Sequence, residues 1–408
     1  MTSNTRVVVI GAGLAGVRLA RRLGELGTPA LLVGEEEHRP YNRVLLAEVL
    51  AGRYVPEVIA LPAPTGLVRA RVTGIDRAGR LLRCADGSVI AYDTLVLATG
   101  SNPVLPPLRG LFTPDHELPE GVHAFRTMDD CLALSKAVRP GVRAVVVGGG
   151  LLGVSAARAL AARGAQVVLA QQAERLMERQ LDPNASRLVL RHLKDLGVEV
   201  HTECRVRDVR SVGGAVRSVE MADGYALDAD LVVIACGVHP RVGLAQDAGL
   251  AVHKGVLVDD ELRTSDPHIH AIGDCAQHAG TVYGLATPAL EQAEALAELL
   301  AGDPASATAR YTGTRSLTRL TLTGPDSPFD LAAFGETEAL PGDDVVQLTD
   351  ATRGTYRKVV VRDDRLVGGV LVGELGTVGA LARAWEGAEP LPSDGGPLLH
   401  LLTNDGGS

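Results

Sequence analysis

Two glycine clusters in the chain have the residue types and the spacing that hold a dinucleotide. Residues 7–27 read VVVIGAGLAGVRLARRLGELG and residues 144–164 read AVVVGGGLLGVSAARALAARG, a repeat with a constant offset of 137 residues. In each copy a β-branched run leads into G-x-G-x-x-G and then into an Ala- and Leu-rich helix, which is the start of a Rossmann βαβ unit. The glycines are Gly11, Gly13 and Gly16 in the first copy and Gly148, Gly150 and Gly153 in the second.

Each glycine of such a cluster has its own physical role. The first permits a tight turn from strand to helix, the second lets the backbone approach a pyrophosphate, and the third lets the helix pack on the strand. The helix N-terminus then presents free N–H groups and the positive end of its dipole to the phosphates. Because both clusters occur in the same context, we interpret them as two dinucleotide-binding units in one chain.

The residue at the end of the second strand of each unit decides how a ribose is bound. In the first copy this strand ends ALLVGEEEHRP, and Glu35 lies 19 positions after Gly16. We therefore predict that Glu35 accepts hydrogen bonds from ribose hydroxyls. Glu36 and Glu37 are interpreted as solvated loop charges.

The second copy lacks this acid. Its second strand ends VVLAQQAERLM, with Gln171 and Gln172 where a carboxylate would stand. Because nothing there repels a 2′-phosphate, the sequence leaves the choice between NADH and NADPH open. Arg175 lies near enough in sequence to attract such a phosphate, but a surface Arg beside a strand end is the simpler interpretation.

A third segment ends a strand with a glycine suited to a ligand. Asp93–Pro103 reads DTLVLATGSNP, a buried strand that runs into Ala98, Thr99 and Gly100. The glycine lets the backbone turn close to a bound group. The segment is therefore expected to contribute to the first site.

A fourth segment, Ser265–Gln277, reads SDPHIHAIGDCAQ. Gly273 and Asp274 stand at the carboxyl end of a short strand, which is where α/β sheets bind ligands. His268 and His270 share a strand face by alternation. No third ligand is evident beside them, so we predict no metal site.

A helix is predicted directly after this segment. Thr287 is expected to be its N-cap and Pro288 its first residue, because Thr accepts a backbone N–H there and Pro needs none. The helix is expected to run to Leu300 and to end near Gly302.

Composition excludes several classes of function. The 408 residues are 46% hydrophobic and 22% charged, which is typical of a folded globular chain. A net charge of −9 with scattered Arg residues gives no basic footprint for nucleic acid or for a membrane surface. The uncharged run 144–157 is shorter than the ~18 residues that span a bilayer, and no signal-peptide cleavage site follows residues 7–17. We expect a cytoplasmic protein.

The five cysteines exclude thiol and cluster chemistry. They are widely spaced, and the two nearest in sequence, Cys204 and Cys236, are 32 positions apart. No C-x-x-C exists to shuttle electrons as a dithiol or to hold an iron–sulfur cluster. An odd number of cysteines, without the spacing of a disulfide framework, also fits a reducing compartment.

The order of the motifs, GAGLAG, Glu35, ATGS, GGGLLG, ACGVHP and AIGD, resembles that of the pyridine nucleotide–disulfide oxidoreductase superfamily. These flavoproteins contain two dinucleotide-binding domains, and the likeness covers residues 5–305. More narrowly, RPYNRVLLAEVLAG, ERLMERQLD, VYGLATPALEQA and RGTYRKVVVRDDRLVGGVLVGE resemble the flavoprotein part of NAD(P)H-dependent nitrite reductase large subunits.

The resemblance implies FAD in the first unit and NAD(P)H in the second, with hydride passing from nicotinamide C4 to flavin N5. Glu35 would hold the adenosine ribose, and Asp274 the hydroxyls on the ribityl side. Arg43, in YNRVLL, matches the family's Arg near the flavin, and the helix at Thr287 would point its positive end at the flavin C2 carbonyl. The cofactors carry out the chemistry, so no catalytic residue is predicted. The predicted cofactor-binding residues are Gly11, Gly13, Gly16, Glu35, Arg43, Ala98, Thr99, Gly100, Gly273, Asp274 and Thr287, with Gly148, Gly150, Gly153 and Gln171 in the second unit.

The chain departs from the proteins that it resembles at four points. No cysteine pair lies near residues 40–50, so disulfide-reductase chemistry is not expected. Glu48, interpreted as a solvated helix charge, replaces the Lys of ferredoxin- and rubredoxin-reductase relatives, and Ser155 replaces the Glu of many relatives. Nitrite reductase large subunits continue into siroheme and iron–sulfur domains, for which these residues hold no Cys cluster, so we expect a detached reductase component or a relative with another acceptor.

The expected architecture is α/β, with two Rossmann-like, three-layer dinucleotide-binding domains and a small α+β C-terminal domain. We assign residues 1–112 and 241–306 to the FAD domain, 113–240 to the NAD(P) domain, and 310–408 to the C-terminal interface domain. Linkers are expected at 102–121 and 302–309. In the last domain we predict hairpin strands in 316–324 and 357–374, with Asp363 and Asp364 in a turn, a helix over 380–387 and a loose tail over 389–408.

Three functional hypotheses follow. The first is an FAD-dependent NAD(P)H oxidoreductase that delivers electrons to a partner protein, such as a ferredoxin or a separate siroheme nitrite reductase. The second is a reductase of a small molecule, or an NAD(P)H oxidase. The third is a flavin-bound subunit that has lost nicotinamide use, which the departures Ser155, Gln171 and Glu48 motivate. A homodimer through the third domain is a further possibility that the residues leave open.

Overall fold

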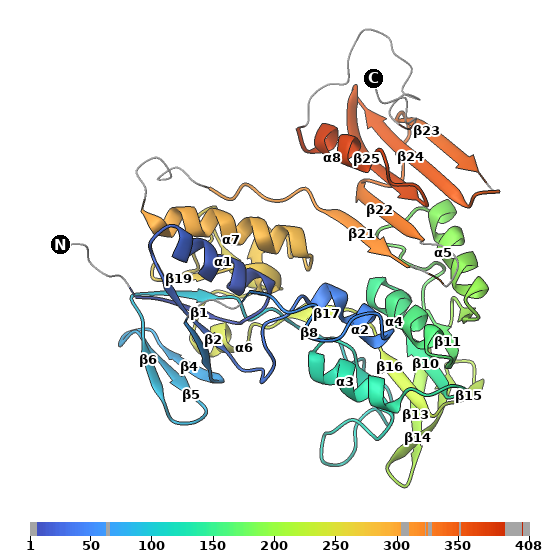
Figure 1. The fold of residues 1–408 in the computed structure, drawn as a ribbon, viewed down its shortest axis with the longest axis horizontal. Helices are drawn as coiled ribbons and strands as arrows, with labels where there is room; N and C mark the ends of the chain where they lie inside the picture. The colour runs from blue at the N-terminus through green and yellow to red at the C-terminus, as the bar shows by residue number, and fades with distance from the viewer. Residues whose placement is uncertain are drawn as a thin grey trace.

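The computed structural model describes residues 6–62, 66–302, 310–322, 324, 329–350, 352–387 and 402 (Figure 1). Within these residues the chain forms three units, each built around a five-stranded sheet. The first unit lies at the left of Figure 1, the second at the lower right in green, and the C-terminal unit at the upper right in orange and red. The predicted fold class, with two Rossmann-like sheets and a small α+β C-terminal part, is confirmed.

The first unit holds a parallel sheet in the order β19-β7-β1-β2-β3. Residues of the β-branched run alternate between its two faces. Val7 and Val9 pack against α1 (Leu14–Glu25) and α7 (Ala286–Ala301). On the other face Val8 packs towards α6 and a small antiparallel sheet of β4, β5 and β6. The bounds are Val7–Ile10 (β1), Ala30–Gly34 (β2), Leu67–Arg69 (β3), Val72–Asp76 (β4), Leu81–Cys84 (β5), Val89–Ala91 (β6), Thr94–Leu97 (β7), Gly243–Asp247 (α6) and Ile269–Ala271 (β19).

The second unit repeats this arrangement with the order β12-β11-β10-β16-β9. One face of its parallel sheet carries α4 and α5, which pack on Ala144 and Val146, and the other carries the antiparallel sheet of β13, β14 and β15, which packs on Val145 and Val147. The bounds are Val122–Ala124 (β9), Met128–Ala137 (α3), Arg143–Val147 (β10), Leu151–Ala162 (α4), Gln166–Ala170 (β11), Pro183–Asp195 (α5), Glu199–His201 (β12), Val206–Val212 (β13), Ala215–Met221 (β14), Ala226–Asp228 (β15) and Leu231–Ile234 (β16).

The chain passes between these two units twice, and the two passages lie side by side. The outgoing strand β8 (Ser101–Pro103) pairs antiparallel with the returning strand β17 (Val238–Pro240). The returning chain then adds β18 (Val256–Val258), η2 (Gly273–Cys275) and β20 (Ala276–His278), with β18 and β20 paired parallel. This double crossover fixes the carboxyl ends of both large sheets near each other.

The C-terminal unit is an antiparallel sheet in the order β21-β22-β25-β24-β23, with α8 (Val378–Gly387) against it. The hairpin of β24 and β25 turns at Asp363 and Asp364, which both have positive φ, as the predicted turn requires. The predicted C-terminal helix is present and begins at Val378 rather than Ala380. The strands are Leu317–Thr321 (β21), Asp330–Gly335 (β22), Asp344–Asp350 (β23), Thr355–Arg362 (β24) and Arg365–Val372 (β25).

One hydrophobic core joins all three units. It contains Tyr41 and Leu50 from the first unit, Leu160 from the second, and Tyr356 and Val370 from the third. The short helices η1 (Arg43–Leu45) and α2 (Leu46–Leu50) therefore pack against the second unit, although their sequence precedes most of the first sheet. None of the helices in the described part of the chain is both long and apolar enough to cross a membrane.

The helix after Gly273 differs from the prediction at its start. It begins at Ala286, with Leu285 as N-cap, so Thr287 does not cap it, and it ends at Ala301, before Gly302 in the left-handed conformation. Pro288 is tolerated inside the first turn because N–H groups there have no partner within the helix. The expected linker beyond Gly302 and nearly all of the expected tail lie outside the described residues.

Candidate active site

In each glycine cluster, two glycines are required by the protein itself. Gly11 has φ of +114°, and a Cβ there would collide with the carbonyl oxygen of Ala98. A Cβ on Gly16 would collide with the carbonyl oxygen of Gly11, so the third glycine lets α1 sit on the turn. Gly148 and Gly153 meet the same obstacles in the second cluster. These four glycines explain the tight strand-to-helix turns and say nothing by themselves about a ligand.

The central glycines, Gly13 and Gly150, are different. Each is the N-cap of its helix, with φ near −80°, and a Cβ on either would meet no atom within 4 Å. No side chain caps α1 or α4. The protein therefore leaves bare backbone and exposed N–H groups at two helix N-termini, which is the arrangement that receives a pyrophosphate. Both clusters fit a dinucleotide.

The second side of each cradle is also repeated. Ala98-Thr99-Gly100 follows β7 and Ala235-Cys236-Gly237 follows β16, with the same offset of 137 residues as the glycines. The carbonyl oxygen of Ala98 approaches Gly11, and that of Ala235 approaches Gly148. This part of the repeat can be seen in the sequence. The sequence analysis missed it because only the segments around the fingerprint glycines were compared.

Glu35 lies directly after β2, at the predicted position, and it is paired. Arg241, next to the returning crossover, makes a bidentate contact with its carboxylate, with Nη2 3.2 Å from Oε2, and Arg71 lies 3.7 Å away. The hydrogen bond from Arg241 lowers the pKa of Glu35 below its ordinary value. Arg241 is held in turn, because its carbonyl oxygen accepts from the Thr99 hydroxyl at 2.8 Å. Sequence reasoning missed Arg241, although it follows the motif ACGVHP directly.

Glu36 is not the solvated charge that was predicted. Its carboxylate accepts from the Tyr41 hydroxyl at 2.7 Å and pairs with the guanidinium of Arg43. The prediction was wrong because the chain turns back after β2 and brings Tyr41 and Arg43 into contact with Glu36. Arg43 also donates to the carbonyl oxygen of Arg126 at 3.1 Å, so it is fixed from two sides.

Asp274 lies in η2, after the short strand β19, as predicted. Its Oδ2 accepts from the Ser101 hydroxyl at 2.8 Å and from Arg126 Nη2 at 2.6 Å. The preceding Gly273 donates its N–H to Gln292 Oε1 at 2.7 Å, which ties η2 to α7. Sequence reasoning missed Ser101, Arg126 and Gln292. Gln292 stands in the quoted motif VYGLATPALEQA, whereas no pattern marked Arg126.

Thr287, the remaining residue predicted for the first site, lies in the first turn of α7. That helix packs on η2, so Thr287 and Asp274 belong to the same end of the first unit. The structure thus brings Gly13, Glu35, Gly100, Asp274 and Thr287 to the carboxyl edge of one sheet.

In the second unit, Gln171 follows β11 and is turned into the protein. Its Oε1 accepts the N–H of Gly149 at 2.8 Å, and its Nε2 donates to the carbonyl oxygen of Arg175 at 3.2 Å. The guanidinium of Arg175 reaches Glu338 of the C-terminal unit at 2.9 Å. The amide of Gln171 therefore supports the glycine turn and presents no negative charge to a ribose.

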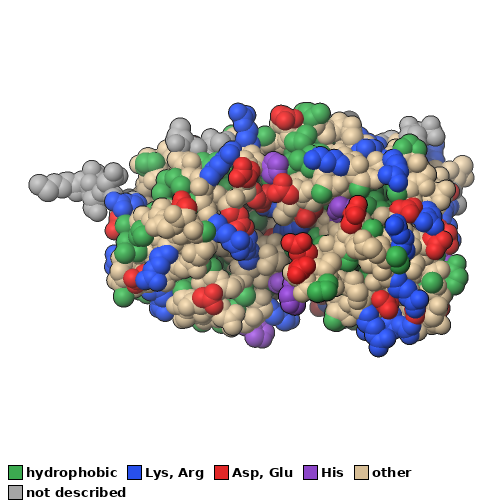
Figure 2. Space-filling view, turned by 90° about the horizontal axis from the view of Figure 1, so that it is seen from below, with side chains coloured by type: hydrophobic (Ala, Val, Ile, Leu, Met, Phe, Trp, Pro, Cys, Tyr) green, Lys and Arg blue, Asp and Glu red, His purple; other side chains and the backbone are tan. Residues whose placement is uncertain are grey.

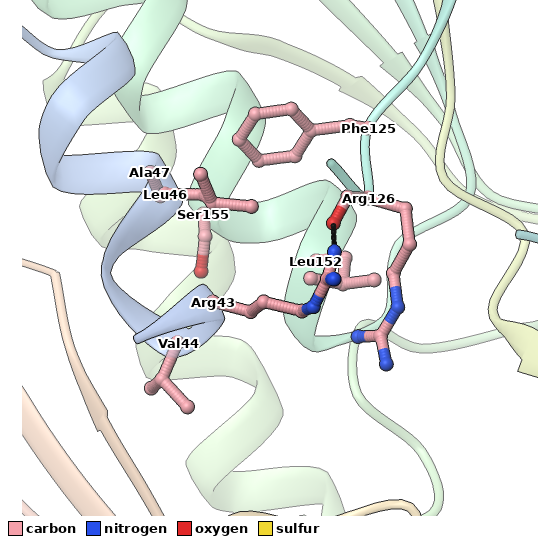
Figure 3. A pocket seen from close by; sticks show the side chains of 8 residues that line it. All are labelled: Arg43, Val44, Leu46, Ala47, Phe125, Arg126, Leu152 and Ser155. Atoms are coloured by element: carbon pink, nitrogen blue, oxygen red, sulfur yellow. Dashed lines mark hydrogen bonds between the residues drawn. The ribbon is translucent and has the colours of Figure 1, made fainter. Parts of the chain in front are cut away.

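A small pocket lies where the two units meet. Figure 3 shows Arg43 and Leu46 from η1 and α2 on one side, Leu152 and Ser155 from α4 on another, and Arg126 closing the third. The Ser155 hydroxyl donates to the Leu151 carbonyl oxygen at 2.8 Å, within its own helix. Two guanidinium groups and no carboxylate therefore line the pocket. The lining residues are Arg43, Val44, Leu46, Ala47, Phe125, Arg126, Leu152 and Ser155.

Glu48 was predicted to be a solvated helix charge, and that prediction was wrong. Its side chain is 16% exposed and pairs with Arg158 of α4, whose side chain is 1% exposed. Arg53 binds the other carboxylate oxygen at 3.2 Å. The packing of α2 on the second unit, rather than on its own sheet, buries this side chain.

The two histidines before Asp274 have separate partners. His268 Nε2 lies 2.8 Å from Arg80 Nη2, and the buried His270 Nδ1 lies 3.2 Å from the carbonyl oxygen of Glu261. Among the residues that the structure covers, no group of three or more potential metal ligands comes together.

Known protein families match the chain over most of its length. The family model of the pyridine nucleotide-disulphide oxidoreductases matches residues 5–293, and that of the rubredoxin NAD+ reductase C-terminal domain matches residues 323–386. The assimilatory nitrate reductase electron transfer subunit of Bacillus subtilis is 33% identical over 90% of this chain and 48% of its own length. A probable ferredoxin reductase, CtmF of Castellaniella defragrans, is 34% identical over 74% of this chain and 77% of its own.

Solved structures show the same fold over nearly the whole chain. The covalent putidaredoxin reductase–putidaredoxin complex contains a chain that superposes with a TM-score of 0.85 at 26% identity, over 98% of this chain and 99% of that one. The first curated relatives are longer, and this chain spans about half their length.

Proposed function

The chain belongs to the pyridine nucleotide-disulphide oxidoreductase family, and on that premise we propose that it is an FAD-dependent NAD(P)H oxidoreductase that passes electrons to a redox partner protein. One observation carries the proposal. Two cradles with bare central glycines, Gly13 and Gly150, belong to the two units whose residues line one shared pocket. Such an arrangement would bring the two ring systems into contact inside one chain.

The first cradle is proposed to hold FAD. Gly11, Gly13 and Gly16 would receive the pyrophosphate at the N-terminus of α1, and Glu35 would accept from the adenosine ribose beside Arg241. Asp274 keeps oxygen lone pairs beyond those used by Ser101 and Arg126, so it can accept from further hydroxyls. Ala98, Thr99, Gly100, Gly273 and Thr287 complete the proposed site.

The second cradle is proposed to hold NAD(P)H. Gly148, Gly150 and Gly153 would receive its pyrophosphate at the N-terminus of α4, and Gln171 supports their turn. The nicotinamide end would then point along α4 towards Leu152 and Ser155. The expected division into residues 1–112 with 241–306, 113–240, and 310–408 is part of this proposal.

The chemistry divides between cofactor and protein. When bound, FAD supplies a hydride acceptor that can release two electrons singly. The chain's own residues bind, orient and exclude water. The guanidinium groups of Arg43 and Arg126 line the pocket as hydrogen-bond donors, and each is also paired with a carboxylate, that of Glu36 and that of Asp274. None of the eight lining residues is an ordinary proton donor or acceptor of the carboxylate or imidazole kind, and hydride transfer requires none.

The names of similar proteins support the proposal that the electron acceptor is a partner protein. They include an electron transfer subunit, a ferredoxin reductase and a reductase covalently joined to putidaredoxin. The C-terminal unit matches the domain model of a rubredoxin reductase. The partner is proposed to be a ferredoxin or a separate nitrite reductase, and a homodimer is also part of the proposal. A cytoplasmic location is proposed because the five cysteines are free, as expected in a reducing compartment.

The partner is tested by comparing acceptors. Purified flavoprotein is supplied with NADH or NADPH, and oxygen consumption is compared with cytochrome c reduction through added ferredoxin. We expect the ferredoxin-dependent rate to exceed oxygen consumption by at least about tenfold. Oxygen consumption that equals or exceeds it would favour the second hypothesis, an oxidase or a reductase of small molecules.

The same preparation tests the third hypothesis. Titration with NADH and NADPH under anaerobic conditions gives a dissociation constant for each nucleotide. A micromolar constant for either one excludes a subunit that has lost nicotinamide use, whereas the absence of binding for both would support it.

A further inference from the structure

The shared pocket lies between two helices that belong to different units. Leu46 and Ala47 of α2 line one side and Ser155 of α4 lines the other (Figure 3). The next residue of α2 is Glu48, and the residue one helical turn further along α4 is Arg158. Their side chains meet directly behind the pocket.

The Glu48–Arg158 pair is well shielded from water. Arg158 is 1% exposed, and Glu48 is 16% exposed at its side chain. An ion pair in such surroundings is screened little by solvent and salt, so removing either charge would leave the other one buried without that partner. Burial lowers the pKa of the Arg158 guanidinium, while the charge of Glu48 opposes that shift.

Two other contacts lie close to the Glu48–Arg158 pair. Arg53 binds Glu48 at 3.2 Å, and this contact lies within the segment that carries Glu48. Arg163, at the end of α4, crosses to α2 and donates to the Leu50 carbonyl oxygen at 3.1 Å. The Glu48–Arg158 pair is therefore a contact between two charged side chains that joins both helices.

We propose that Glu48 and Arg158 are positioning residues that set the separation of α2 and α4, and with it the alignment of the nicotinamide on the flavin. This inference rests on the proposed function. Hydride donor and acceptor must lie ~3–3.5 Å apart, and a displacement of about 1 Å costs on the order of a hundredfold in rate. The pair lies behind the pocket and does not line it, so it acts through the helices.

The test is a double-mutant cycle in the holoenzyme, with Glu48→Gln, Arg158→Met and both together. We expect each single variant to lower the limiting rate of flavin reduction at saturating NAD(P)H by about tenfold or more, with the KM changed less than threefold. The double variant should lose no more than the worse single variant. Asp228→Asn, which removes an exposed ion pair with Arg143 within the second unit, is the control and should stay within threefold of wild type.

A second measurement does not depend on activity. The visible circular dichroism of bound flavin reports the surroundings of the ring, and flavin content reports a folded first unit. We expect full flavin content in all variants, with the same altered dichroism in both single variants and the double variant, and wild-type dichroism in Asp228→Asn. The shorter change Glu48→Asp provides a further variant if Glu48→Gln does not fold.

Three outcomes would overturn the inference. They are single variants that reduce flavin at the wild-type rate, losses that multiply in the double variant, or a fall in rate that matches a fall in flavin content. Failure of the proposed function would look different, because the flavin of the wild-type protein would itself not be reduced by either nucleotide.

Discussion

The glycines of the two fingerprints divide into those that the chain needs and those that a ligand needs. Gly16 and Gly153 lie against backbone oxygens, so any side chain there would push the helix off its turn. Gly13 and Gly150 face open space, so a methyl group there disturbs nothing in the protein. Substitution can therefore separate binding from folding at positions three residues apart.

We predict that Gly13→Ala folds but binds FAD poorly. The new methyl group would occupy the space that a pyrophosphate needs, and we expect the dissociation constant for FAD to rise at least about tenfold, or 1.4 kcal/mol. The stability of the apoprotein should fall by no more than about 1 kcal/mol, the usual cost of Ala at an N-cap. Fluorescence titration with FAD and urea unfolding measure the two effects.

Gly16→Ala is the comparison. Because its Cβ would collide with the Gly11 carbonyl oxygen, it should destabilise the apoprotein more than Gly13→Ala does. Equal stability of the two variants, or unchanged FAD binding in Gly13→Ala, would contradict this division of roles.

Gln171 follows β11 at the position where a carboxylate would add a negative charge to the second cradle. We predict that Gln171→Glu shifts the ratio of kcat/KM for NADH over NADPH upwards by about tenfold, because a carboxylate accepts from a ribose and repels a 2′-phosphate. The neighbouring, exposed Gln172→Glu is the matched control and should change the ratio less than threefold. Steady-state kinetics with both nucleotides give the ratios, and an unchanged ratio in Gln171→Glu would place the ribose elsewhere.

Local elements were predictable where one short pattern determines them. The strand–glycine–helix sequence gave both Rossmann starts, and Asp363-Asp364 between alternating runs gave the β24–β25 hairpin. The start of α7 was placed two residues late, because Thr-Pro is a common helix beginning and yet Pro is equally compatible with the rest of the first turn.

Contacts between distant elements were not predictable. Glu36 and Glu48 have the local signature of solvated acids. The return of residues 41–50 pairs Glu36 with Arg43 and buries Glu48 against Arg158 of the second unit. Arg126 has no local signature at all, because its partner Asp274 is 148 residues away. A single sequence does not indicate which distant residues come into contact. The site could therefore be located, but the ion pairs within it could not be predicted.

The β24–β25 turn offers a prediction at the level of the hairpin. Asp363 and Asp364 both have positive φ, and a type I′ turn prefers Gly at its second central position. We expect Asp364→Gly to stabilise the C-terminal unit by about 0.5–1 kcal/mol, since Gly removes the steric cost of the left-handed conformation. Thermal unfolding measures this, and Asp344→Gly in strand β23 should destabilise instead. A loss of stability in Asp364→Gly would show that the Asp side chain itself supports the turn.

At the scale of the whole molecule, a buried polar contact joins the second unit to the C-terminal unit, in addition to the hydrophobic core that all three units share. Asp182, at the N-cap of α5, is 2% exposed. It accepts from the Tyr356 hydroxyl at 2.6 Å and from Lys358 Nζ at 3.2 Å, both on β24. The exposed pair of Arg175 and Glu338 joins the same two units at their surface. Elsewhere the charges are dispersed, with basic and acidic side chains interspersed over the face in Figure 2.

We predict that Asp182→Asn destabilises the protein by about 3 kcal/mol, because it leaves the Lys358 ammonium buried without its counter-charge. Asn keeps the N-cap of α5, so the helix itself should be little affected. Glu338→Gln, which removes the exposed pair between the same units, should cost less than about 1 kcal/mol. Urea unfolding compares the two, and equal losses would show that the buried contact does not hold the units together.

The central claim is that one chain brings a flavin and a nicotinamide into contact, and anaerobic titration of the holoprotein tests it most directly. Flavin content is determined first, and NADH or NADPH is then added stepwise while the flavin absorbance is recorded. We predict one FAD per chain, bleached by one equivalent of at least one of the two nucleotides. A protein that binds FAD and keeps its full absorbance with an excess of both would contradict the account.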